Sequence, residues 1–157
     1  IARRDGDRCT CTVGQRVGYL NRLSGPLLDR IDLHVWMNPV DTRRLIDRPK
    51  SESSAVVAAR VTAARQVQRN RYAGEGINTN AEMSNAQMEK FCPLSEDCKS
   101  LLENIIDRLG LSARAYSRIV RISRTIADLE GAPEILPVHI SEAAGYRFLD
   151  RRNFGEL

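Results

Sequence analysis

The chain of 157 residues is long enough for one domain, or for one domain and the edge of another. Its 42% hydrophobic and 28% charged residues are typical of an ordinary globular protein, and its 5% aromatic content argues against an aromatic stacking platform for single-stranded nucleic acid. The net charge of +4 arises from 24 basic and 20 acidic residues, so it permits an acidic partner but does not require one.

The chain contains no apolar run of about 18 residues and nothing like a signal peptide, so we expect no membrane contact. Its four cysteines are then expected to be reduced thiols of a cytoplasmic protein. The sequence begins at Ile1 rather than at methionine, which favours a piece of a longer protein.

In chain order, the first predicted element is a helix that Thr12 caps and whose apolar spacing continues to Leu23. The following Ser24-Gly25-Pro26 is expected to end it, with a tight turn behind it. Residues 31–37 then alternate Ile, Leu, Val and Met with Asp, His and Trp, which is the period of a strand. One strand cannot form a sheet, so we expect its partners upstream of Ile1.

After a polar segment from Asp41 to Ser53, the pattern is helical to the end. The helix from Ser54 to Tyr72 places Val57, Val61 and Ala64 on one face. Four more helices are predicted. The first spans 84–91, the second runs from a Ser95 cap to Gly110, the third runs from a Ser112 cap to Gly131, and the fourth begins near Pro137. The predicted fold class is mainly α, with a helical bundle preceded by the last helix and strand of an α/β unit.

The most informative segment is Leu23-Ser-Gly-Pro-Leu-Leu-Asp-Arg-Ile-Asp-Leu-His-Val35. It places Asp29 and Arg30 on a tight turn at the entrance of the predicted strand. In a ring of ATPases, such a position suits an arginine that reaches a neighbour's phosphate, because a guanidinium is always charged and matches phosphate oxygens. The alternative is that Arg30 merely pairs with Asp29 or Asp32 at the surface.

A second constellation lies in residues 110–121. On a helix, Arg114, Arg118 and Arg121 fall within about 60° of one another. Arg114 also lies in the first turn, where the helix dipole disfavours a cation by roughly 0.3–1 kcal/mol. A bound anion would account for this placement, since a helix start with an arginine can form a phosphate site. An exposed basic helix face is the alternative.

Two further features have weaker implications. The helix from Ser54 carries Arg60, Arg65, Arg69 and Arg71, but these arginines do not share one face, so their pattern does not favour DNA contact through this helix. Cys9 and Cys11 resemble half of a metal site, whereas structural zinc takes four ligands. The chain contains no phosphate-binding Gly-x-x-x-x-Gly-Lys-Ser/Thr loop, no strand ending in Asp-Glu and no paired nucleophile and base, so we expect it to be inactive alone.

Together these segments resemble the Mg-chelatase-like AAA+ ATPases of bacteria, of the ComM/YifB type. The first stretch is Ser24 to Val35, and the second is Leu109-Gly-Leu-Ser-Ala-Arg-Ala-Tyr116 with Arg124-Thr-Ile-Ala-Asp-Leu129. The final Glu142-Ala-Ala-Gly-Tyr-Arg147 fits more loosely. The resemblance implies that residues 1–40 are the truncated C-terminal edge of an AAA+ α/β core and that residues 41–157 are a helical lid domain.

The resemblance further implies roles for single residues. Arg30 would be the arginine finger acting on ATP of the next subunit, with Asp29 in support. Arg114 would be the sensor-2 arginine touching ATP of its own subunit, with Arg118 as a weaker candidate. Cys9 and Cys11 would match the second half of a cysteine cluster, which would be a candidate zinc site of the intact protein.

The implied function is that of the C-terminal part of an ATPase that performs helicase-like work on DNA in a ring, expected to be hexameric. ATP and Mg²⁺ are expected in the intact protein, with neither bound tightly by this chain. The rival interpretation is a non-catalytic helical adaptor that binds nucleic acid or protein through its basic helices. That rival predicts salt-sensitive DNA binding by the chain alone.

Overall fold

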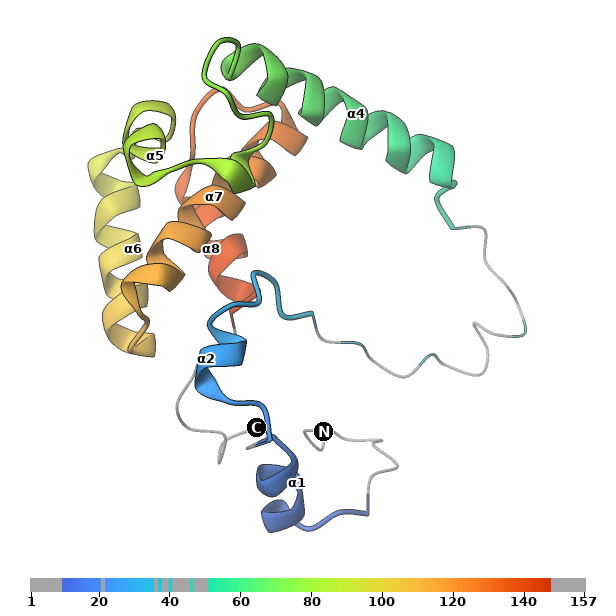
Figure 1. The fold of residues 1–157 in the computed structure, drawn as a ribbon. Helices are drawn as coiled ribbons and strands as arrows, with labels where there is room; N and C mark the ends of the chain where they lie inside the picture. The colour runs from blue at the N-terminus through green and yellow to red at the C-terminus, as the bar shows by residue number, and fades with distance from the viewer. Residues whose placement is uncertain are drawn as a thin grey trace.

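The computed structural model describes residues 10–20, 22–35, 37, 40, 46 and 51–147. Figure 1 shows a bundle of helices with a long helix projecting from one end and two short helices near the other. Within the described residues the fold is mainly α, as the sequence predicts. The elements are α1 (Val13–Leu20), α2 (Gly25–Leu28), α4 (Ser54–Arg71), the 3-10 turn η1 (Asn80–Glu82), α5 (Asn85–Phe91), α6 (Glu96–Leu109), α7 (Ala113–Glu130) and α8 (Pro137–Gly145).

The first helix starts where Thr12 predicts it. The Gln15 amide donates to Thr12 Oγ1 at 3.3 Å, and the Thr12 amide donates to Gln15 Oε1 at 2.8 Å, which is a capping box. The helix ends at Leu20, one turn earlier than predicted. Ser24 does more than interrupt the chain, because its hydroxyl accepts from the Leu27 amide at 3.3 Å and so starts the four-residue helix α2.

The strand predicted over 31–37 is not formed in residues 31–35 and 37. Their alternation is that of a strand, but a strand needs a ladder partner, and no described segment pairs with them. The segment instead lies against the end of α8, where the His34 amide donates to the Tyr146 carbonyl at 2.7 Å. All four apolar residues of the predicted alternation remain exposed: Ile31, Leu33, Val35 and Met37.

The helices of the bundle begin and end at the residues that the sequence indicates. Ser95 and Ser112 accept from the amides of Cys98 and Ala115 and so cap α6 and α7. Both helices end in a left-handed glycine, Gly110 with φ 59° and Gly131 with φ 73°. Local capping chemistry therefore fixes these boundaries.

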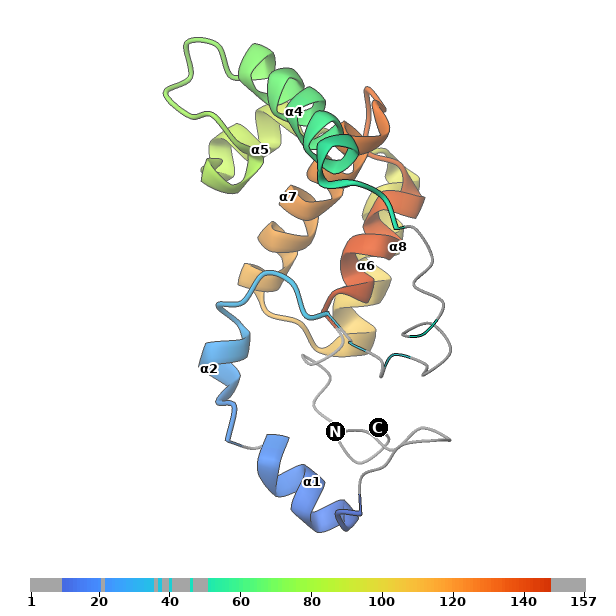
Figure 2. The same cartoon turned by 90° about the vertical axis from the view of Figure 1, so that its right-hand side faces the viewer.

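The core lies around α7, which packs against α8, α4, η1 and α5, while α6 packs against α8. Figure 2 shows α7 and α8 side by side with α6 behind them. The core side chains come from α5, α6, α7 and α8 and from the segments that connect the helices: Tyr72, Met83, Met88, Cys92, Cys98, Leu102, Ile119, Val120, Ile126, Ile135, Ile140 and Ala143. None of the described helices is long and apolar enough to cross a bilayer.

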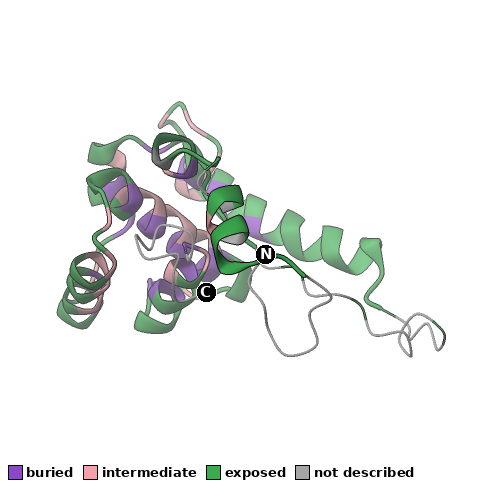
Figure 3. Ribbon diagram, turned by 90° about the horizontal axis from the view of Figure 1, so that it is seen from below, coloured by how far each residue is buried: buried purple, intermediate pink, exposed green. Residues whose placement is uncertain are grey.

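Helix α4 departs from the predicted burial pattern. Of its predicted inward face only Ala64 is buried, while Val57 and Val61 are 38% and 45% exposed. The reason is visible in Figure 3: the first half of α4 extends beyond the bundle and is exposed along its length. Only the second half of α4, around Ala64 and Gln68, meets other helices.

Candidate functional site

The turn that carries Arg30 follows α2 directly. Leu28 is buried, and the amides of Arg30 and Ile31 donate to the carbonyls of Leu27 and Leu28 at 3.0 and 3.1 Å. Arg30 is exposed, and its side chain forms no hydrogen bond or ion pair with any residue that the structure describes. Its guanidinium is therefore available to an anion outside this part of the chain.

Asp29 joins this turn to the start of α7. The Ser112 hydroxyl donates to Asp29 Oδ1 at 2.9 Å, and Arg114 Nη1 donates to Asp29 Oδ2 at 2.8 Å. Ser112 accepts at the same time from the Ala115 amide, so one hydroxyl both caps α7 and holds the carboxylate. The two segments that are most informative in the sequence are thus in direct contact.

Opposing effects act on the pKa of Asp29. Desolvation raises it, but the hydrogen bonds from Ser112 and Arg114 and the charges of Arg114 and Arg118 together lower the pKa below its ordinary value. Asp29 is consequently ionised at neutral pH, and an ionised carboxylate is the stronger partner for a guanidinium.

The three arginines that share a face of α7 have separate partners. Arg114 meets Asp29, Arg118 Nη1 lies 2.5 Å from Asp32 Oδ1, and Arg121 donates to the Met83 carbonyl at 2.5 Å. Two of these partners are the carboxylates that flank Arg30 in sequence. The alternative in which Arg30 pairs with Asp29 or Asp32 is not seen here, because both carboxylates receive arginines from α7.

Sequence reasoning assigned no role to Arg147, which is fully buried. Its guanidinium donates to the carbonyl of Ile31 and, at 3.5 Å, to that of Asp32. Arg147 therefore anchors the backbone directly after the Arg30 turn to the end of α8. The loosely fitting stretch Glu142 to Arg147 was the only signal in the sequence that pointed to it.

A buried ionic network ties α4 to α7 and was also missed. Both oxygens of Asp128 accept from the Arg71 guanidinium, and Asp128 Oδ1 also accepts from Arg124 Nε at 3.1 Å. Asn80 Nδ2 donates to Asp128 Oδ2 at 2.9 Å. Arg71 is therefore a structural residue of α4, although the sequence grouped it with the basic residues of that helix.

The remaining arginines of α4 point to solvent. Arg60 forms a two-bond pair with Glu52 at 2.9 and 3.0 Å. Arg65 and Arg69 are exposed and form no ion pair with the described residues. Only these two remain from the predicted basic helix as free cations for an external partner.

The cysteines offer no metal centre within the described part of the chain. Cys9 lies outside the described residues, and Cys11 is exposed. Cys92 and Cys98 are buried, and burial raises the pKa of the Cys92 thiol to about 11. Among the described residues no group of three His, Cys, Asp or Glu side chains could hold a metal ion.

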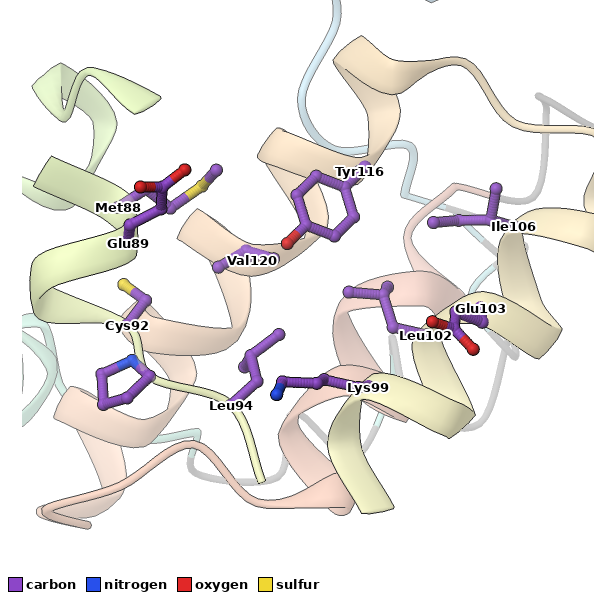
Figure 4. Close-up of a pocket in the computed structure, with 11 residues that line it drawn as sticks. Met88, Glu89, Cys92, Leu94, Lys99, Leu102, Glu103, Ile106, Tyr116 and Val120 are labelled. Atoms are coloured by element: carbon purple, nitrogen blue, oxygen red, sulfur yellow. The ribbon is translucent and has the colours of Figure 1, made fainter. Parts of the chain in front are cut away.

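An open groove of about 440 Å³ lies between α5, α6 and α7 (Figure 4). Its wall is mainly apolar, and its charged members are Glu89, Lys99 and Glu103. None of the arginines predicted to bind nucleotide lines it. The groove therefore differs in chemistry from the Arg30 turn and has no concentration of cations for a phosphate.

Comparison with protein-family models gives two adjoining matches. Residues 51–147 match the model described as magnesium chelatase, subunit ChlI C-terminal, and residues 2–45 match magnesium chelatase, subunit ChlI. The chain belongs to the magnesium chelatase ChlI family. The match over residues 2–45 contains the Arg30 turn, and the match over residues 51–147 contains the bundle with Arg114.

Several bacterial proteins are similar to this family member along most of its length. The uncharacterized protein YifB of Salmonella typhimurium is 40% identical over 148 residues, which is 93% of this chain and 28% of that protein. The competence protein ComM of Haemophilus influenzae is 41% identical over 138 residues, or 87% of this chain and 26% of ComM. The chain thus spans little more than a quarter of the length of these relatives.

Proposed function

We propose that this chain is the C-terminal part of an AAA+ ATPase, in which it supplies arginines to bound ATP. The observation that carries the proposal is the contact of Asp29 with Arg114, because it gathers Arg30 and Arg114 around one turn. Arg30 is exposed and free of ion pairs within the described residues. A pair of guanidinium groups at one place suits the charge that spreads over a transferring phosphoryl group.

The role proposed for Arg30 is that of an arginine finger acting on the ATP of a neighbouring subunit. In such a contact the guanidinium stabilises charge on the phosphoryl oxygens without taking part in covalent chemistry. Identical subunits that contact one another head to tail form a ring when the rotation between neighbours closes, and we propose a ring of six subunits.

Arg114 is proposed as the sensor-2 arginine. The resemblance of the chain to its family implies that Arg114 contacts ATP of its own subunit. The ion pair between Arg114 and Asp29 instead favours ATP of the neighbouring subunit. Asp29 precedes Arg30 directly and binds Arg114, so we propose that a phosphate reached by Arg30 across an interface is also within reach of Arg114 of the same chain. We therefore propose that both arginines serve one nucleotide, held by the neighbour. Arg118 is the weaker candidate, because its side chain is only 16% exposed whereas that of Arg114 is 59% exposed.

The described residues suit phosphate better than Mg²⁺, because they contain no group of three metal-binding side chains. We propose that ATP and Mg²⁺ are held by segments of the longer protein that this chain does not contain. The proposed division into a core edge, residues 1–40, and a lid, residues 41–157, is supported by the change from one family match to the other between residues 45 and 51.

The test is ATP hydrolysis by mixed subunits of the full-length protein. Arg30→Ala should lower kcat by roughly 10³–10⁵-fold, the usual worth of an arginine finger. A second variant that lacks a working phosphate loop should be inactive alone. Mixing the two should restore hydrolysis, because the first contributes intact ATP sites and the second contributes Arg30. The same mixture with Arg114→Ala tests whether Arg114 also acts on the neighbour's nucleotide.

The matched control is Arg60→Ala, which removes an exposed arginine in the first half of α4, the part of that helix that extends beyond the bundle. It should hydrolyse ATP at the normal rate. If Arg30→Ala also kept the normal rate, Arg30 would be an ordinary surface residue. If it lost activity that mixing failed to restore, the finger would act within its own subunit.

The work proposed for the ATPase is on DNA. The alternative function, an adaptor that binds nucleic acid without catalysis, is favoured only by the exposed Arg65 and Arg69. Titration of this chain with duplex DNA at several salt concentrations separates the two. An adaptor would bind with an affinity that falls steeply as salt rises, whereas the ATPase part should bind weakly at every salt concentration.

A further inference from the structure

The two acidic residues that flank Arg30 are both bound to α7. Asp29 pairs with Arg114 at 2.8 Å, and Asp32 pairs with Arg118 at 2.5 Å. The acids stand three residues apart in the turn, and the arginines stand four residues apart on the helix, so that each pair links successive points of the two segments. We call these four residues the clasp.

The backbone next to the clasp is fixed as well. The carbonyl of Ile31 accepts from the buried Arg147, and the amide of His34 donates to Tyr146 at 2.7 Å. Leu28 before the turn and His34 after it are both buried. Residues 28–34 are therefore held to the beginning of α7 and to the end of α8, and α7 and α8 pack against each other.

Of the charged side chains in residues 28–34, Arg30 alone forms no ion pair with the described residues. A segment that is anchored on both sides of one free arginine can hold that arginine in a set direction. Each pair of the clasp joins one exposed and one largely buried side chain: Asp32 is 61% and Arg118 16% exposed, and Arg114 is 59% and Asp29 25% exposed. Ion pairs that stay open to solvent on one side contribute modestly to stability.

We propose that the clasp is a positioning device: Asp29 and Asp32 make the Arg30 turn move as one body with α7. The proposal rests on the proposed function, since it gives Arg30 a phosphate to reach. Asp32 and Arg118 act on ATP only through Arg30. Their loss should then lower kcat, which depends on the placement of the finger, and leave the KM for ATP nearly unchanged.

The experiment compares Asp32→Asn, Arg118→Asp and the exchanged double variant Asp32→Arg with Arg118→Asp. Hydrogen exchange of the amides of residues 28–34, measured on this chain, should speed up by about tenfold in either single variant, because the turn opens more often. The exchanged pair should return it toward the original rate. Glu96→Gln, which removes a remote exposed pair with Lys99, is the control and should change nothing at the turn.

The second readout is steady-state hydrolysis by the full-length protein with the same variants. Each single variant should lose about tenfold or more in kcat with little change in KM, and the exchanged pair should recover most of it. Unchanged exchange at residues 28–34 would overturn the proposal, and so would a normal kcat in Asp32→Asn. A normal kcat in Asp32→Asn together with an inactive Arg30→Ala would support Arg30 as the arginine finger and would contradict only the positioning role of the clasp. An active Arg30→Ala would instead remove the proposed function.

Discussion

At the scale of single residues, Asp128 is the most demanding position in the fold. Its side chain is fully buried, yet it carries a charge between Arg71 and Arg124. Burial raises the pKa of Asp128, but the hydrogen bonds from Arg71 and Asn80 and the charges of the two arginines outweigh this and lower the pKa below its ordinary value. The carboxylate is thus the counter-charge for two guanidinium groups.

Asp128→Asn should lower the free energy of unfolding by about 3–5 kcal/mol, because it leaves buried cations without their partner. Urea denaturation of this chain, followed by circular dichroism at 222 nm, measures the loss. Glu52→Gln breaks the exposed pair with Arg60 and serves as the control, with nearly unchanged stability. Equal stability of the two variants would mean that the network contributes no more than a surface pair.

At the scale of elements, the ends of the helices depend on glycine conformation. Gly110 ends α6 with φ 59°, and no atom lies within 4 Å of the position that a Cβ would occupy. Gly110→Ala should therefore cost about 1 kcal/mol through backbone strain alone. Gly145→Ala is the matched control, since it is equally unhindered but has no left-handed φ. Thermal unfolding of the two variants compares them directly, and a loss in both would point to packing instead of φ.

The same elements show what the sequence can predict. Caps such as Ser95 and Ser112, and the stop at Gly110, lie within a few residues of the groups they satisfy, so local patterns are sufficient. The prediction of a strand over residues 31–37 was wrong in the described residues. Alternating apolar and polar residues show which side chains would share a face, but they do not supply the neighbouring strand that a ladder needs. The exposed Val57 and Val61 have a similar cause: the helical period placed them on one face correctly, but burial depends on how far the bundle reaches.

The candidate site was predictable to a similar degree. The sequence singled out Asp29, Arg30 and Arg114 because they stand at a turn and at a helix start. The contact between Asp29 and Arg114 joins residues that are 85 positions apart in the chain, and no sequence periodicity relates positions so far apart. Arg147 and Asp128 were missed for the same reason, since each acts only through a distant partner.

At the scale of the whole molecule, stability should depend on pH at both ends of the range. The pKa values of Asp29 and Asp128 are lowered by folding, so their contribution is present above the unfolded pKa of about 4 and is lost as pH falls through the lower folded values. Cys92 acts in the opposite sense, because its pKa rises to about 11: its contribution is present below the unfolded pKa and is lost as pH rises toward 11.

The melting temperature should therefore be flat between pH 5 and 8, within the usual range of maximal stability of about pH 5–8. It should fall on either side of that range. Scanning calorimetry of this chain across pH checks the profile. Asp128→Asn should weaken the acid dependence, and Cys92→Ala should weaken the alkaline dependence. A melting temperature that kept rising below pH 4 would contradict the assignment of ionised, paired carboxylates.

The projecting helix α4 has a mechanical consequence. Its 18 residues make a rod of about 27 Å, and the Arg71–Asp128 network fixes the base of that rod to α7. A rigid rod fastened at one end works as a lever. If the bundle tilted by 10°, the far end of α4 would travel about 5 Å, close to the pitch of one helical turn. A small rotation of α6, α7 and α8 would therefore move Ser54, at the far end of α4, by about the pitch of one helical turn.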